Sequence, residues 1–174
     1  MFSAARGKAF ARKRSFMREF TASHTTVYTD RESRVINMAL ALLERNIKKR
    51  KAVSSPEEVK AYLRLKLECL DREVFAAMFL NNQHQLISSE LLFAGTIDCV
   101  DIHPREVVRR AVLLNAAAVI FAHNHPSGNA EPSNADREIT EKLVNALSLV
   151  GMRVLDHIVI GHGEMVSFAE RGWL

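Results

Sequence analysis

A short apolar run that ends in two histidines constrains this chain more than any other feature. Residues 117–122 read AAVIFA, which is too short and too rich in β-forming residues for a helix and predicts a buried central strand. The chain continues through His123, Asn124 and His125 into a Pro-Ser-Gly turn. Because side chains at i and i+2 of a strand share one face, His123 and His125 are expected to converge, while Asn124 points to the opposite face.

The segment after this turn brings back a hydroxyl and a carboxylate. Ser133 and Asp136 precede an apolar-periodic stretch, in the spacing of a helix capping box. The same placement lets Asp136 join His123 and His125, and two imidazoles with one carboxylate form the ligand set of an open catalytic zinc site. Capping and metal binding are compatible at one helix start, so the residues leave both interpretations open.

The rest of the chain predicts helices that alternate with strands around a mixed sheet, which is an α/β or α+β fold in one domain. Apolar spacing and helix-start signals predict helices over residues 31–51, 54–67, 104–116 and 133–150. Short β-rich runs predict strands over residues 73–80, 84–95, 117–122, 152–161 and 165–168, the first two as a hairpin.

Charge divides the chain into two parts. Residues 1–51 hold 13 Lys and Arg against 4 Asp and Glu, whereas residues 52–174 hold 11 against 16. We therefore expect a basic N-terminal tail and helix over 1–51 and an acidic main domain over 52–174. The basic arm suggests weak DNA contact through phosphates, although such segments are more often solvated. Its acid-poor start also has the composition of an organellar transit peptide.

The composition also bears on the compartment. No apolar run approaches the roughly 18 to 20 residues that a membrane helix needs, so we expect no membrane segment. Cys69 and Cys99 are too few and too far apart for a disulfide framework or a Cys-rich zinc site. A reducing, cytoplasmic location is the resulting expectation.

Other hydrolytic and nucleotide motifs are missing from the sequence. A zinc deaminase needs H-x-E with P-C-x-x-C, and the chain has neither. H-E-x-x-H, G-x-S-x-G and G-x-x-x-x-G-K-[ST] are also absent. These absences leave residues 123–136 as the main candidate site.

The complete pattern resembles a known family. H-x-H, seven residues and S-x-x-D make up the metal motif of the JAMM (MPN+) metalloproteases, and HNHPSG followed by PSNAD is similar to its RadC branch. The likeness extends over residues 52–174, including HPREVV, LDHIVIG and SFAERG. It implies a single MPN (JAB) domain, with a mixed sheet flanked by helices in a cytidine-deaminase-like layering. Longer RadC proteins carry a helix-hairpin-helix module that needs paired glycines; the first 94 residues contain only Gly7, so the resemblance is to the short form.

The resemblance also implies a role for each motif residue. His123, His125 and Asp136 would hold Zn²⁺, and Ser133 would hydrogen-bond the attacking water or the oxyanion. Glu73 matches the family's upstream glutamate, which takes the proton of the water; Glu90 is the rival position.

The expected function is therefore a zinc-dependent metallohydrolase that cleaves a peptide or isopeptide bond in an unidentified peptide or protein substrate. The alternative is a DNA-repair-associated or prophage accessory protein, in which the domain is a binding scaffold and zinc is structural or vestigial. His157, next to Asp156, is expected to support the structure or a ligand rather than to bind the metal.

Overall fold

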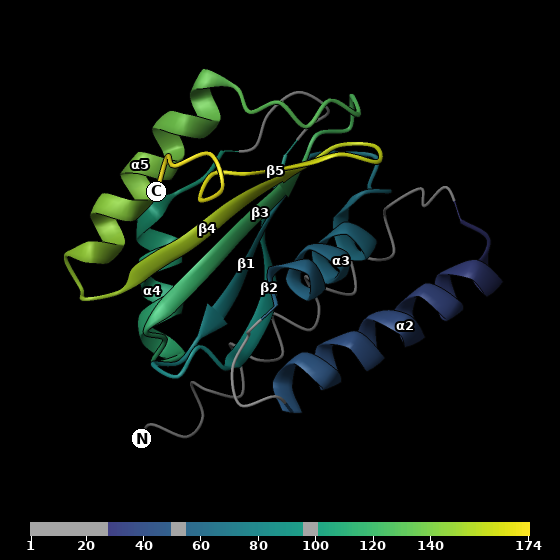
Figure 1. Ribbon diagram of the computed structural model, residues 1–174, viewed down its shortest axis with the longest axis horizontal. Helices are drawn as coiled ribbons and strands as arrows, with labels where there is room; N and C mark the ends of the chain where they lie inside the picture. Colours follow the sequence, from purple (N-terminus) through teal and green to yellow (C-terminus); the bar gives the residue numbers. More distant parts are fainter. Residues whose placement is uncertain (1–27, 50–54, 96–100) are drawn as a thin grey trace, which may run out of the picture.

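The computed structural model describes residues 28–49, 55–95 and 101–174 (Figure 1). Within these residues, one mixed sheet has the strand order β2-β1-β3-β4-β5, and only β3 and β4 run parallel. Its strands are β1 (Val74–Leu80), β2 (Leu86–Ala94), β3 (Ala118–Asn124), β4 (Arg153–Ile160) and β5 (Met165–Ser167). The predicted hairpin is β1 with β2, and the predicted central strand is β3. Both predictions are confirmed.

Helices cover both faces of the sheet, as expected for an α+β fold. In the described residues they are α2 (Asp30–Lys49), α3 (Pro56–Leu67), α4 (Pro104–Leu113) and α5 (Asn134–Ser148). Helices α4 and α5 lie on one face, while α3 lies on the other with α2 outside it (Figure 1). Proline in the first turn of α3 and of α4 has a φ angle suited to a helix start. Its missing N–H costs no hydrogen bond there, because N–H groups in the first turn have no intrahelical acceptor.

The period-two pattern of the strands builds a separate apolar core on each face. Phe75, Phe79 and Phe121 point toward α4 and α5, where they pack with Val107 and Leu143. The alternate strand residues point toward α3, as the buried set Ala76, Met78, Ala118, Ile120 and Ala122 shows. A strand in the middle of the sheet is therefore buried on both sides, which accounts for the unbroken apolar run before His123.

Several predicted element ends differ from the observed ones, and a left-handed residue explains two of these differences. The predicted helix over 104–116 stops at Leu113, because Asn115 adopts a left-handed conformation with φ of 51°. The predicted strand from His84 begins at Leu86, because His84 is also left-handed, with φ of 57°.

The predicted boundary between residues 51 and 52 lies outside the described residues, and so does the basic segment 1–27 for which DNA contact is expected. Helix α2 belongs to the predicted N-terminal part, yet its Ile47 is buried in the same core as α3. None of the helices in the described ranges combines the length and apolarity required to span a bilayer.

Candidate metal centre

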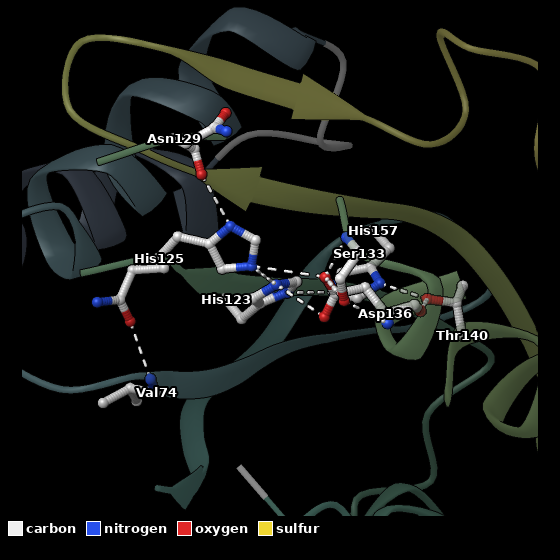
Figure 2. A network of polar contacts seen from close by, with 9 residues as sticks. Val74, His123, His125, Asn129, Ser133, Asp136, Thr140 and His157 are labelled. Atoms are coloured by element: carbon white, nitrogen blue, oxygen red, sulfur yellow. Dashed lines mark hydrogen bonds and ion pairs between the residues drawn. The ribbon is translucent and has the colours of Figure 1, made fainter. Parts of the chain in front are cut away.

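The two motif histidines and the motif aspartate meet at the end of β3 (Figure 2). His123 is the penultimate residue of β3, His125 follows the strand, and Asp136 lies in the first turn of α5. The Nε2 atoms of the two histidines are 3.0 Å apart, and Asp136 Oδ1 lies 3.2 Å from Nε2 of His123. Asp136 Oδ2 lies 3.5 Å from Nε2 of His125. These three residues can hold a metal ion.

The three residues of the cluster differ in their exposure to solvent. The His123 side chain is 1% exposed, whereas those of His125 and Asp136 are 17% and 12% exposed. His123 sits deep because it continues the buried face of β3. Solvent therefore meets the cluster on the side of His125 and Asp136.

A main-chain carbonyl determines the tautomer of His125. Its Nδ1 lies 2.8 Å from the carbonyl oxygen of Asn129, in the loop that leads to α5 (Figure 2). Because a carbonyl oxygen only accepts, Nδ1 carries the hydrogen. Nε2 of His125 then presents its lone pair to the cluster, as a metal ligand requires.

A relay through β4 and α5 determines the tautomer of His123. The Thr140 hydroxyl donates to the carbonyl oxygen of Asp136 at 2.5 Å, so it accepts from Nδ1 of His157 at 2.6 Å. Nε2 of His157 then accepts from Nδ1–H of His123 at 2.8 Å. Nε2 of His123 is left with its lone pair toward the cluster. His157 thus lies behind a candidate ligand, and its supporting role stays a prediction.

The chemistry of this donor set fits a divalent cation. Two nitrogen lone pairs and a carboxylate face one another within 4.8 Å, an arrangement that is repulsive unless a positive charge lies between them. Without a cation, a proton takes this place: burial alone would raise the pKa of Asp136, but the hydrogen bonds that such a proton makes possible with His123 and His125 hold that pKa far below its ordinary value. The hydrogen bond with Asp136 raises the pKa of His125. A bound cation would satisfy all three groups at once.

The predicted capping box is present together with the cluster. Ser133 N and Oγ both donate to Asp136 Oδ2 at 2.7 Å, and Ser133 Oγ accepts from Asp136 N at 3.1 Å. Asp136 therefore orients its carboxylate through the helix start and presents it to the histidines from there. Since the single hydroxyl hydrogen of Ser133 goes to Asp136, its role toward water or an oxyanion stays a prediction.

Of the two candidate bases, Glu73 lies beside the cluster. It directly precedes β1 and shares a face with Phe75, whose strand partner is His123. Burial raises the pKa of Glu73, and its charge interacts with all three cluster residues.

Glu90 is engaged elsewhere. Glu90 lies on β2, opposite Ala77 of β1. Arg110 of α4 donates to both of its carboxylate oxygens, at 2.7 and 2.5 Å. Ser88 also donates to it. The buried Glu90 carboxylate therefore forms a structural ion pair that links β2 to α4.

The sequence reasoning missed two residues of the site. Thr140 lies one helical turn after Asp136, so the i, i+4 spacing in α5 could have indicated it. The Asn129 contact uses a main-chain oxygen and leaves no side-chain signal.

The fold and the cluster together define a JAB-domain protein. Residues 53–173 match the family described as the RadC-like JAB domain, and the chain belongs to this family.

Similar proteins carry the name UPF0758. The chain is 55% identical over 140 residues to a UPF0758 protein of Vibrio parahaemolyticus and 56% identical over 140 residues to one of Vibrio cholerae. Each match covers 80% of this chain and 62% of the relative. A UPF0758 protein of Xanthomonas euvesicatoria is 62% identical over 123 residues, which cover 71% of this chain and 55% of the relative. The chain thus spans less than two thirds of these relatives, and their names indicate no activity.

Proposed function

We propose that this protein is a zinc-dependent hydrolase that cleaves an amide bond, either a peptide or an isopeptide bond. The observation that carries the proposal is the convergence of two imidazole lone pairs, each directed by a hydrogen bond behind its ring, on one carboxylate. Two nitrogens and one oxygen with an exposed side are typical of catalytic zinc, which keeps one position for water or substrate.

His123, His125 and Asp136 would hold the ion. Zn²⁺ in such a site acidifies water and polarises a carbonyl oxygen. The relay behind His123 and the Asn129 carbonyl behind His125 keep both rings in the ligand tautomer. The capping box keeps the carboxylate in place.

Glu73 would act as the general base and then as the general acid. It would take the proton of the attacking water and deliver it to the leaving amine, since an amide nitrogen leaves only after protonation. Burial raises the pKa of Glu73 and brings it closer to neutral pH, where a carboxyl group exchanges protons more effectively. Ser133 would turn its hydroxyl from Asp136 to the developing oxyanion, a contact worth about 3 kcal/mol where such donors have been removed.

Metal content of purified variants tests the proposal. About one zinc per chain is expected for the wild type, with loss in His123→Ala and Asp136→Ala and retention in Glu73→Gln. A library of quenched fluorescent peptides, including branched lysine isopeptides, then tests hydrolysis, which Glu73→Gln should abolish. If the wild type binds no zinc even after reconstitution, Ser133 and Asp136 form only a helix cap. Binding of zinc equally by Asp136→Ala would also contradict the proposed ligand set.

A further inference from the structure

We propose that Asn124 is a positioning residue for Glu73, because its side-chain amide holds the backbone on both sides of that glutamate. The inference rests on the proposed role of Glu73 as the base. It assigns a task to the middle residue of the His-Asn-His motif, whose side chain does not reach the cluster.

The Asn124 side chain is buried and has a partner for each polar atom. Its Oδ1 accepts a hydrogen bond from the main-chain N–H of Val74 at 2.9 Å. Its Nδ2 donates to the carbonyl oxygens of Arg72 at 3.0 Å and Leu70 at 3.4 Å. Leu70 and Arg72 lie in the segment that joins α3 to β1, and Val74 is the first residue of β1.

Two of these partners belong to the peptide units that flank Glu73. The Arg72 carbonyl is part of the unit before Glu73, and the Val74 N–H is part of the unit after it. Gly95, directly after β2, donates its main-chain N–H to the Glu73 carbonyl at 2.9 Å and holds the second unit from the other side. Since peptide units are planar, fixing both of them fixes the direction in which the Glu73 side chain leaves the backbone.

The end of the β-ladder explains why an asparagine suits this position. Main-chain pairing between β1 and β3 ends at Phe75 and His123. The main-chain N–H of Val74, just before this pair, points toward β3 and needs another acceptor there. Asparagine offers an acceptor and two donors on one planar group, which matches the three main-chain partners. An apolar side chain would leave buried main-chain groups without partners.

One tripeptide therefore serves both halves of the proposed site. His123 and His125 project from one face of β3 toward the candidate metal site. Asn124 projects from the opposite face and holds the backbone on both sides of Glu73. Misplacing a catalytic group by about 1 Å can cost a hundredfold in rate. The metal ligands have their own supports in His157, Asn129 and Ser133, so loss of Asn124 should leave metal binding largely intact.

Cobalt loading separates positioning from folding. Co²⁺ is loaded into the wild type, Asn124→Leu, Asn124→Thr and Glu73→Gln. Two quantities are measured: the number of Co²⁺ ions bound per chain, and the pH at which the visible absorption spectrum of the bound Co²⁺ is halfway through its change (the pH midpoint). Asn81→Leu is the matched control, because Asn81 accepts main-chain N–H groups of Gln83 and Gln85, both at 2.9 Å, at the opposite end of β1.

All variants are expected to bind about one Co²⁺ per chain. Asn124→Leu should move the pH midpoint in the same direction as Glu73→Gln and by about half as much or more. The reason is that the Glu73 carboxylate would no longer be held toward the metal site in this variant. Asn124→Thr, which keeps one donor and one acceptor, should lie between Asn124→Leu and the wild type, and Asn81→Leu should match the wild type. Exchange of the Val74 amide hydrogen should accelerate about tenfold in Asn124→Leu.

A midpoint that moves in Glu73→Gln but stays at the wild-type value in both Asn124 variants would overturn the positioning role alone. A midpoint that does not move in Glu73→Gln would overturn the proposed base, and this inference with it. If Asn81→Leu shifts as far as Asn124→Leu, the effect comes from general loosening of β1, and the inference is wrong.

Discussion

The position of one hydrogen atom on His123 decides which of its ring nitrogens can bind a metal. Because the Thr140 hydroxyl donates to a main-chain carbonyl, His157 has to donate through Nδ1 and accept through Nε2. Burial lowers the pKa of His157 well below its ordinary value, so the ring stays neutral and can accept this bond. His157 thereby supports the candidate ligand without belonging to the ligand set.

Replacing His157 by phenylalanine keeps a ring of similar shape but removes the acceptor for His123. Zinc affinity, measured by competition with a chromophoric chelator, is expected to fall about 10- to 100-fold. Thr140→Val removes the far end of the relay and should cause a smaller loss. His103→Phe changes an exposed histidine and should leave the affinity unchanged. Wild-type affinity in His157→Phe would show that the tautomer of His123 does not depend on this bond.

At the scale of elements, the start of α5 combines a helix cap with a candidate ligand. The Ser133 hydroxyl and main-chain N–H both hold Asp136, so the helix end and the carboxylate are ordered together. Ser133→Ala should lower the free energy of unfolding of the metal-free protein by about 1 kcal/mol and weaken zinc binding as well. Denaturant unfolding and metal competition measure the two effects. Ser133→Thr keeps the cap and is the control; equal losses in both variants would argue against the hydroxyl as the cause.

The contact between α3 and β2 contains a partly buried amine. Lys66 Nζ donates to Ser89 Oγ at 2.7 Å and to the Tyr62 hydroxyl at 3.1 Å. Burial lowers the pKa of Lys66 to about 8, whereas burial raises that of Tyr62 to about 12. The charged amine is therefore less favourable in the folded protein than in the unfolded chain.

This shift predicts a pH dependence of stability. Between pH 8 and 10 the unfolded chain binds more protons at Lys66 than the folded protein does, so the free energy of unfolding should rise with pH. Above pH 10 the raised pKa of Tyr62 acts in the opposite direction, because the folded protein keeps the phenol proton. Urea unfolding across this range should show the rise in the wild type and a flatter curve in Lys66→Met. Lys60→Met, on the same helix, should keep the wild-type slope; a flat wild-type curve would contradict the prediction.

At the scale of the whole molecule, a metal at the end of β3 would join several elements. The three candidate ligands come from β3, the turn after it and α5, and their supports come from β4 and the loop before α5. An ion that binds only the folded state stabilises it by about 2.7 kcal/mol at one hundred times its Kd.

Metal removal should therefore lower the Tm. For a chain of this length, about 2.7 kcal/mol corresponds to roughly 5 to 10 °C. Calorimetry of the zinc-loaded wild type with and without chelator should show this drop, and added zinc should reverse it. Asp136→Ala should give the same Tm under both conditions. A chelator effect of equal size in Asp136→Ala would place the stabilising ion elsewhere.

The fold was largely predictable because its signals are local. Strand β3 follows from a short run of β-forming residues, and α3 and α4 begin at their prolines. The element ends at His84 and Asn115 were not predicted, because left-handed conformations depend on the surrounding turn.

The shared face of His123 and His125 and the helix start at Ser133 and Asp136 can be predicted from the sequence, because both follow from the periods of strand and helix. Which residues contact these groups depends on the tertiary fold. It placed His157 behind His123 across 34 residues, and Asn124 beside Val74 across 50. It also set Glu73 rather than Glu90 beside the cluster. Such contacts depend on which strands pair and in which register, and no spacing along the chain contains that information.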